Sequence, residues 1–512
     1  RRKRSTGIMR SPCLRLKQQI LLYEAFEGKF DFGQLQSAGR QSGGRSRPKR
    51  LNLRSEARMM GRMVESVLEI LNLIPLAAGA VLGGLVIAAA GRERAWRAAG
   101  IAVVGLAGNT ALWLALNHWG AVPAVRLINI AALAAVSLLA ALSMVRYFPR
   151  TAPAADDPVE RYDERDHMFS RNNMWRHPAL AESYYREHPE RQAADATIRR
   201  KPALGAPGGR WYDPAQTPLA EAAFTVLGRA LDLAEGEPAP VRTSAPPAEI
   251  ARMIEAAARM YGAADVGFAA LEDLHLYSHA GRHASRWGRP IERRHAAAVV
   301  LVVAMDWRRI RQAPAAPVMV ESSRQYVEAA RIAWVVAEYI RQLGWNARAH
   351  VDANYEVICP PLAEAAGLGH VGRMGVFMHR VHGPCVRLAV VTTDLELPAT
   401  CGDHSAMEHF CAICRKCADN CPAGAIERGS RPVSRGFAHW SVVQERCYGF
   451  WRTAGTDCAV CVAACPYTKP DTAIHRLARW YVSRNPLNQR LALIADDALY
   501  GRRHRLPPAS AS

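Results

Sequence analysis

The stretch Cys411-Ala-Ile-Cys414-Arg-Lys-Cys417-Ala-Asp-Asn-Cys421-Pro422 determines how the C-terminal part of this chain is built. A related run begins at Cys447 and, ten residues later, continues as Cys458-Ala-Val-Cys461-Val-Ala-Ala-Cys465-Pro466. Three closely spaced thiolates cover one face of an iron–sulfur cubane, and a distant cysteine supplies the fourth ligand. The two runs therefore predict two [4Fe–4S] clusters in one ferredoxin-like module.

The last cysteine of each run is predicted to bind the cluster of the other run, as it does in two-cluster ferredoxins. One cluster is then held by Cys411, Cys414, Cys417 and Cys465. The other is held by Cys447, Cys458, Cys461 and Cys421. This exchange ties the two runs together through their metal centres.

Zinc is the main alternative for these cysteines. Zinc ribbons pair two Cys-x-x-Cys units but lack the x₃-Cys-Pro ending that occurs twice here. Eight of the 12 cysteines crowd into the two runs, which is not the spread of a disulfide framework. The remaining four, Cys13, Cys359, Cys385 and Cys401, are expected to be buried or incidental thiols.

The formal net charge of +20 lies mostly at the N-terminus. Residues 1–62 hold sixteen Lys and Arg against four Asp and Glu. Such a charge suggests a nucleic-acid or membrane partner. Because this stretch is rich in Gly, Ser and Arg, we expect residues 1–68 to be a basic leader, disordered or partly untranslated, and we expect no nucleic-acid partner.

Three uncharged runs follow, at residues 70–91, 98–117 and 127–145. A helix needs about 20 apolar residues to cross a bilayer, and Trp and Tyr flank these runs as they do at membrane interfaces. Residues 69–148 are thus predicted to form three transmembrane helices, with buried helices of a soluble core as the alternative. Arg92, Arg94 and Arg97 in the first loop place that loop and the C-terminal part on the cytoplasmic side of the inner membrane.

The rest of the chain is expected to hold a layered α/β (α+β) core. Residues 149–250 are rich in Pro and charge and are expected to form an extended wrap or linker. Residues 251–399 form the core, with a doubly buried strand at 296–305, a helix at 324–343 and a strand at 385–392. Residues 400–470 form the cluster module, and residues 471–512 form a tail that packs on the core.

The second cysteine run, with Cys447-Tyr-Gly-Phe-Trp451 before it and Tyr-Thr-Lys469 after it, resembles that of the reductive dehalogenases. The glycine-rich segment at residues 367–375 is similar to a signature of the same family. The segments at 168–171, 383–388, 393–397, 474–475 and 496–499 are similar as well, so the resemblance spans about residues 160–505. The three apolar runs depart from the commoner exported form of that family.

The resemblance implies a nitroreductase-like α/β core that holds base-off cobalamin, followed by the two-cluster module. It implies that carbon–halogen bonds are reduced to carbon–hydrogen bonds. No complete Asp-x-His-x-x-Gly motif occurs, and Asp273-x-His275 is its nearest approach. The small residues Gly367, Gly369 and Gly375, together with Arg373, are expected to lie against the corrinoid.

The resemblance also assigns the proton chemistry. Carried over by position, Tyr326 is the proton donor, Arg387 stabilises the phenolate that Tyr326 leaves, and Asn354 orients the substrate or the phenol. Two inserted residues between Gly344 and Asn354 weaken the last assignment. Without the resemblance, each of these side chains would be read as ordinary core packing, an ion pair or a turn residue.

Two other functions remain open. An epoxyqueuosine reductase, which modifies tRNA, shares the corrinoid and cluster plan, but it is soluble and its catalytic acid resembles an aspartate. A membrane ferredoxin would only transfer electrons and would not need about 150 residues of α/β core. For the leading function the expected partners are a small halogenated organic substrate, the membrane, and an electron donor that is quinol-linked or a ferredoxin or flavodoxin.

Overall fold

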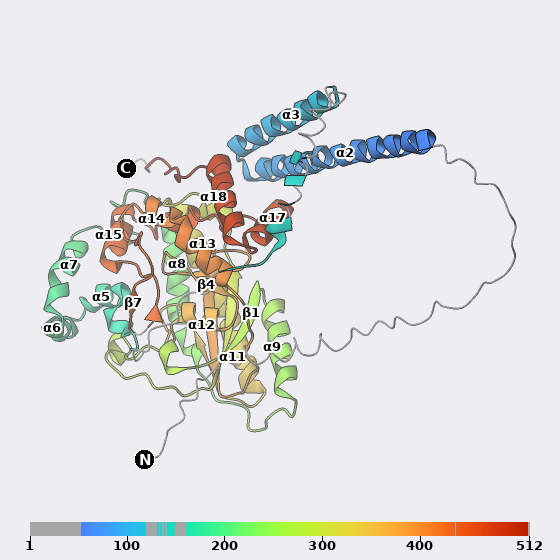
Figure 1. Ribbon diagram of the computed structural model, residues 1–512. Coiled ribbons are helices and arrows are strands. Elements are labelled where there is room, and N and C mark those ends of the chain that lie inside the picture. Colours follow the sequence, from blue (N-terminus) through green and yellow to red (C-terminus); the bar gives the residue numbers. More distant parts are fainter. Residues whose placement is uncertain are drawn as a thin grey trace, which may run out of the picture. The chain divides into compact units, whose positions relative to one another are not determined.

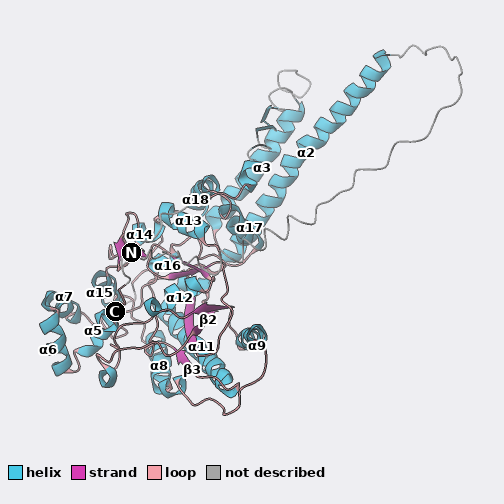
Figure 2. Ribbon diagram, turned by 60° about the horizontal axis from the view of Figure 1, so that its bottom comes forward, coloured by secondary structure: helices cyan, strands magenta, loops and turns pink. Residues whose placement is uncertain are grey.

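The computed structural model describes residues 53–118, 131–132, 134–135, 138, 141–148, 160–435 and 437–509. The chain divides into two compact units, residues 1–77 and 78–512. The described part of the first unit is the beginning of one long helix, α2, and all other described elements lie in the second unit. Figure 1 labels these elements, and Figure 2 shows them from a second direction.

The two N-terminal helices are long and apolar. α2 (Leu53–Glu93) and α3 (Trp96–His118) each contain a stretch suited to crossing a bilayer, Leu76–Glu93 and Trp96–Ala115. Only 17% and 6% of these stretches is buried. A core helix of a soluble protein hides its apolar side chains, so this outward display favours membrane association.

Two expectations for this region are corrected. Residues 53–68 are helical rather than part of an unstructured leader, because their Leu, Arg, Glu, Met and Ala residues are strong helix formers that extend α2 toward the N-terminus. Among the described residues two helices, not three, are long and apolar enough to span a membrane. Most of the third run, at 127–145, lies outside the described residues.

The segment between the helices and the core is more helical than expected. Instead of an extended wrap, it contains short helices linked by turns: η1 (Glu164–Asp166), α5 (Met168–Met174), α6 (Pro178–Glu187), α7 (Pro189–Arg199), α8 (Gln216–Arg229) and η2 (Leu231–Ala234). Prolines in the first turn favour the starts of α6 and α7, since that position needs no backbone donor. These helices pack on α11 and on the cluster module.

The core is a four-stranded antiparallel sheet of order β1-β2-β6-β3. Its strands are β1 (Asp265–Ala270), β2 (Ala297–Ala304), β3 (Ala347–His350) and β6 (Val386–Thr393). β2 is central and almost wholly buried, so the doubly buried strand predicted at 296–305 is confirmed. The predicted helix at 324–343 and strand at 385–392 correspond to α11 (Ala316–Gln342) and β6.

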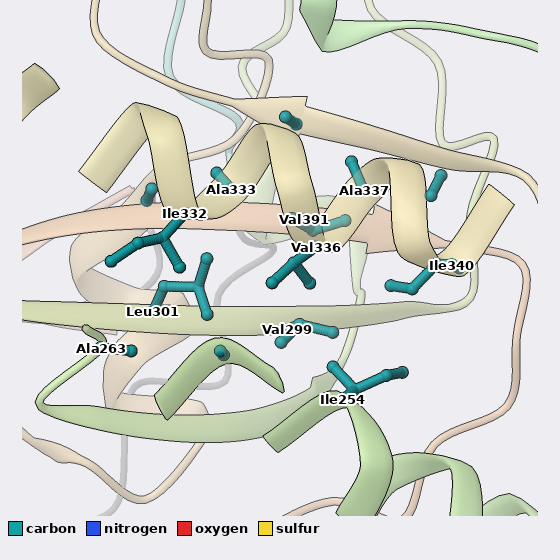
Figure 3. Packing of buried hydrophobic residues seen from close by; sticks show 14 of the residues in the cluster. Ile254, Ala263, Val299, Leu301, Ile332, Ala333, Val336, Ala337, Ile340 and Val391 are labelled. Atoms are coloured by element: carbon teal, nitrogen blue, oxygen red, sulfur yellow. The ribbon is translucent and has the colours of Figure 1, made fainter. Parts of the chain in front are cut away.

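Helices cover both faces of the sheet. α11 packs Ile332, Val336 and Ile340 onto β2 and β6 from one side, together with α9 (Pro247–Met260), as Figure 3 shows. α12 (Cys359–Ala365) covers the other face, where Leu362 belongs to the cluster around Val300. Alternate residues of β2 therefore serve two separate apolar layers. The mixed helix and strand fold is confirmed, and its nitroreductase-like character stays a prediction.

The remaining elements build the connections of the core and the cysteine-rich module. Around the core they are η3 (Asp273–His275), η4 (Ala284–Arg286), α10 (Trp307–Ile310), β4 (Gly369–Val371) and β5 (Phe377–His379). In the module they are α13 (Ser405–Cys414), α14 (Lys416–Asn420), β7 (Val433–Ser434), β8 (Phe437–Ala438), α15 (Gln444–Ala454), α16 (Val460–Ala463), α17 (Ala473–Val482) and α18 (Pro486–Tyr500).

The packing of α11 on the sheet can be tested with Ile340→Ala. Ile340 is fully buried, so truncation removes apolar contacts and leaves a cavity. We expect the free energy of unfolding to fall by about 2–5 kcal/mol. Val226→Ala on α8 is the control, since Val226 is 61% exposed and should change stability by less than about 0.5 kcal/mol. Equal effects of the two variants in chemical denaturation would contradict this packing.

Candidate functional site

The structure brings Cys465 to the first cysteine run. Cys411, Cys414 and Cys417 lie at the ends of α13 and α14, and Cys465 returns to them after α16. These four thiols line one cavity, with Met374, Met378, Phe410 and Pro466 as its apolar walls. Burial raises the pKa of the free Cys411 thiol to about 11 and that of Cys414 to about 12. Any metal bound here would therefore have to displace protons from the thiols.

The other four cysteines form a second group. The charges of Cys421 and Cys447 act on the thiols of both Cys458 and Cys461. Cys458 and the next residue, Ala459, adopt positive φ angles of 57° and 53°, which turn the chain sharply before α16. Since α14 packs on α16, the two groups are neighbours. The two groups match the predicted arrangement, in which Cys465 joins the first run and Cys421 joins the second.

Neither group has the geometry of a single-ion site. Among the described residues, no three His, Cys, Asp or Glu side chains are close enough to hold one metal ion. A zinc ion would draw its thiolates to about 2.3 Å from one centre. Each iron of a cubane takes a single cysteine, so a cluster spreads its four thiolates around a larger body.

Arg373 supports the first cysteine group. Its guanidinium is buried and donates to the backbone carbonyls of Cys411 and Ala412, each at 3.0 Å, and to those of Glu427 and Gly429. It also lies over the ring of Trp440, 4.6 Å from the centroid. These contacts hold the parts of the cysteine module together, and the expectation that Arg373 also lies against a corrinoid stays a prediction.

The three glycines of the same segment permit close approaches to the chain's own backbone. A Cβ on Gly367 would meet the backbone of Cys401, and one on Gly369 would overlap the carbonyl oxygen of Met378. Gly375 has φ +70° and faces Val442. The corrinoid contacts expected for these glycines stay a prediction.

Tyr326 and Arg387 are brought together as expected. Tyr326 lies on α11 and Arg387 on β6, and the guanidinium carbon is 4.8 Å from the centroid of the tyrosine ring. Burial raises the pKa of the Tyr326 phenol, and the Arg387 charge offsets part of this rise. A tyrosine in this setting is a neutral acid whose phenolate would be stabilised by a fixed cation.

Arg387 links this pair to the second cysteine group. It donates to the hydroxyl of Ser322 and forms an ion pair with Asp457, with 3.6 Å between Nη2 and Oδ2. Asp457 immediately precedes Cys458 in the chain. Two buried polar atoms here, Nε of Arg387 and Oδ1 of Asp457, have no hydrogen-bond partner. Orphaned polar atoms of this kind mark a place where a further group is expected to bind.

Asn354 is engaged elsewhere. Its Oδ1 accepts from Arg286 at 2.7 Å and from Arg348 at 3.0 Å, while its Nδ2 donates to the carbonyl of Leu231 at 3.4 Å. These contacts occupy both ends of the amide, so the structure gives Asn354 a role in holding its turn. The role expected for it beside Tyr326 is not supported.

Asp352, two residues earlier in the same turn, is one of the charged residues that change the pKa of the Tyr326 phenol. Its negative charge adds to the rise in the pKa of the Tyr326 phenol. The next residue, Ala353, has φ +63°, and its carbonyl oxygen is 2.6 Å from Nε2 of His283. Asp352, Ser322 and Asp457 were all missed from the sequence. The two-residue insertion before Asn354 was the signal that could have identified Asp352.

His275, the histidine of the incomplete corrinoid motif, stabilises the local backbone. His275 is buried, and its Nδ1 accepts the backbone N–H of Glu272 at 3.1 Å, so it caps η3. Burial lowers the pKa of His275 to about 4, which keeps the ring neutral. This contact gives His275 a structural role at the start of η3.

Comparisons with known proteins agree with the cysteine geometry. Residues 410–469 match a family model described as a 4Fe-4S dicluster domain. The chain is 34% identical over 195 residues to a tetrachloroethene reductive dehalogenase of Desulfitobacterium hafniense, covering 35% of this chain and 34% of the relative. It is 30% identical over 216 residues to that of Sulfurospirillum multivorans, covering 41% and 43%. The chain thus spans well under half the length of these curated relatives.

A second class of relative shares a shorter stretch. An epoxyqueuosine reductase of Francisella cf. novicida (strain Fx1) is 32% identical over 102 residues, covering 20% of this chain and 28% of the relative. Among solved structures, the catabolic reductive dehalogenase NpRdhA in complex with 3-bromo-4-hydroxybenzoic acid matches with a TM-score of 0.57 and 24% identity. That match covers 70% of this chain and 49% of NpRdhA, and it shows a common fold.

The crosswise grouping of cysteines can be tested by single substitutions. Cys421→Ala should damage the cluster of the second run and leave that of the first, whereas Cys465→Ala should do the reverse. Each variant is expected to retain about half of the iron and sulfide of the unmodified chain. Iron analysis with EPR of the reduced protein makes the measurement. Loss of only the first cluster in Cys421→Ala would contradict the grouping.

Proposed function

We propose that this protein is a reductive dehalogenase that uses cobalamin, supplied with electrons through two [4Fe–4S] clusters. The observation that carries the proposal is the junction of Tyr326, Arg387 and Asp457. In this proposal Tyr326 is the proton donor and Arg387 the fixed cation, and Arg387 is linked through Asp457 to the neighbouring cluster cysteine, Cys458. The named relatives and the shared fold support the same conclusion.

The cluster assignment follows from the two cysteine groups. Cys411, Cys414, Cys417 and Cys465 would hold one [4Fe–4S] cluster, and Cys421, Cys447, Cys458 and Cys461 the other. Because the groups adjoin through α14 and α16, electrons can pass from one cluster to the next. The second group is the one that reaches the Tyr326 junction, which makes it the exit toward the substrate.

The junction also suits a corrinoid. Nε of Arg387 and Oδ1 of Asp457, which have no hydrogen-bond partner, could bind polar groups of a corrinoid beside Tyr326. Cobalamin supplies low-potential, two-electron chemistry at cobalt when it is bound. Reduction of a carbon–halogen bond takes two electrons and one proton and releases halide. The protein must therefore deliver one proton to carbon and keep bulk water away from the reaction.

Tyr326 delivers that proton from its phenol oxygen. An exposed tyrosine has a pKa near 10, and burial here raises it further, so the phenol is protonated at neutral pH and poorly acidic alone. Arg387 compensates by stabilising the phenolate that remains, and Ser322 and Asp457 hold the guanidinium in place. The Asp352 charge opposes phenolate formation and thereby favours rapid reprotonation of Tyr326.

The two alternatives fit these observations less well. An electron carrier has no use for a buried acid–cation pair at the end of its clusters. An epoxyqueuosine reductase would be expected to present an aspartate as its acid, and here α11 presents Tyr326 above Arg387. We also propose that α2 and α3 hold the protein in the inner membrane. The arginines of the α2–α3 loop place that loop on the cytoplasmic side, and the catalytic part lies on the same side when the run at 127–145 makes a third crossing.

The acid role can be tested with Tyr326→Phe in the full chain, assayed anaerobically with cobalamin, a low-potential donor and aryl or alkenyl halides. Removing the phenol should lower halide release by about 10²-fold or more, while iron, sulfide and cobalamin contents stay unchanged. Tyr339→Phe is the matched control, because it makes the same change farther along α11. Equal turnover of the two variants would remove Tyr326 from the acid role.

The cation can be tested at Arg387. Arg387→Gln removes the charge that stabilises the phenolate, so we expect kcat to fall by about 10²–10³-fold with little change in cobalamin content. Arg387→Lys keeps a cation and should recover part of this loss. If the glutamine and lysine variants have the same activity, the charge of Arg387 has no catalytic role.

A further inference from the structure

Helix α18 buries polar side chains and exposes a row of aliphatic ones, whereas a surface helix of a water-soluble protein usually does the opposite. It buries polar side chains: Asn488 is 1% exposed and Gln489 is fully buried. It exposes Leu487, Leu491 and Ile494, at 51%, 48% and 68%. These three residues are spaced i, i+4 and i+7, so they form one continuous stripe on the outward face.

The polar side chains on the inner face of α18 form hydrogen bonds and ion pairs with the rest of the protein. Gln489 donates to the carbonyls of Ala406 and Val482, at 2.7 and 3.0 Å, and its Oε1 accepts from Nδ1 of His409. Further along, Asp496 and Asp497 pair with the buried ammonium of Lys416. These contacts fix the rotation of the helix, so the apolar stripe cannot turn inward without breaking buried polar pairs.

The stripe continues an apolar surface that starts on the N-terminal helices. α18 lies against α3, as both views show. α3 exposes Val103 and Val104, at 54% and 72%, along its own length. Two neighbouring helices that both expose aliphatic side chains are more than isolated surface leucines.

Polar contacts of Glu93 and the Trp480–Arg484 pair indicate the level at which the bilayer would end. Glu93, the last residue of α2, is 4% exposed. Its Oε1 accepts from Nε2 of His475 on α17 at 2.7 Å, and its backbone carbonyl accepts from Arg311 at 2.7 Å. Next to α18, Trp480 is 37% exposed, and the Arg484 guanidinium lies 4.6 Å from its ring centroid. Trp and Arg together are typical of the headgroup level of a membrane.

Exposed arginines occur on α18 and on the adjacent α17. Arg490 is exposed on α18 itself, and Arg476, on α17, is exposed and pairs with Asp471. Exposed leucines rimmed by arginines suit a lipid surface with anionic headgroups, because the arginines pair with phosphate while the aliphatic chains enter the acyl boundary. A helix of this kind lies in the interface rather than across the bilayer.

We infer that the outward face of α18 is a second membrane contact, which lies in the lipid–water interface beside the point where α2 and α3 leave the bilayer. The partner is a phospholipid surface with anionic headgroups. This inference rests on the proposed membrane association and deepens it. Because Ala492 and Leu493 on the inner side of α18 pack against the first cysteine group, one helix separates that group from the lipid. The first cluster is therefore the one nearest the membrane.

Photo-crosslinking tests this contact. A diazirine amino acid is placed at Ile494 in the full chain, in nanodiscs that contain phosphatidylglycerol, and irradiated. The same amino acid at Val226 on α8, which is 61% exposed, is the matched control. We expect several-fold more phospholipid adduct at Ile494 than at Val226 by mass spectrometry, with unchanged iron and sulfide contents. Equal adduct yields would overturn the inference, and so would a crosslink at Ile494 to a second copy of the chain.

Failure of this inference can be told apart from failure of the membrane proposal. Fractionation of the unmodified full chain, with an alkaline carbonate wash, reports whether α2 and α3 hold it in the membrane. A chain that stays with the membrane but gives no lipid adduct at Ile494 contradicts only the α18 contact. A chain that washes off and gives no adduct contradicts both.

Discussion

The return of Cys465 to the first cysteine run is the constraint on which the functional half of this structure depends. Cys465 lines the cavity of the first cysteine group, and Cys421 lies instead with the second group, near Cys461. The loop between α15 and α16 contains Asp457 and Cys458. Asp457 forms an ion pair with Arg387 on β6. One exchange of cysteines thus joins the cluster module to the α/β core, and the acid–cation pair lies at that joint.

The electrostatics of the joint follow from burial. Tyr326 and Asp457 both have raised pKa values because they are withdrawn from water, and Arg387 is the cation that acts on both. Ser322 accepts a hydrogen bond from the same guanidinium and fixes its position. Electrons arriving at the second cysteine group and a proton leaving Tyr326 would therefore meet within one connected set of side chains. This is the arrangement that a reaction consuming both requires.

Much of this could be predicted from the sequence where a local pattern carried the signal. The cysteine spacing predicted both groups, and the apolar run at 296–305 predicted the central strand β2. The position of Tyr326 relative to Arg387 was also found, through the family resemblance. What could not be predicted depended on long-range contacts. Arg373 donates to the backbone carbonyl of Cys411, and Asn354 accepts from Arg286 and Arg348.

Other differences have equally physical causes. Spacing cannot reveal that the charge of Asp352 contributes to the pKa of Tyr326, since this depends on how the turn around Ala353 folds. Nor did hydropathy find α18, because its apolar residues alternate with polar ones and only the fold shows which face is buried. Membrane contact by α18, if α2 and α3 anchor the chain, would hold the first cluster at the lipid surface and the substrate junction deeper in the catalytic part.

The central claim is that the Tyr326 junction reduces a carbon–halogen bond at cobalamin. The most direct measurement is halide release by the purified full chain, reconstituted anaerobically with iron, sulfide and cobalamin and given a low-potential donor and a panel of aryl and alkenyl halides. The account predicts about one bound cobalamin per chain and one halide released per two electrons consumed. A chain that assembles both clusters but binds no cobalamin, or that binds it and releases no halide from any substrate, would contradict it.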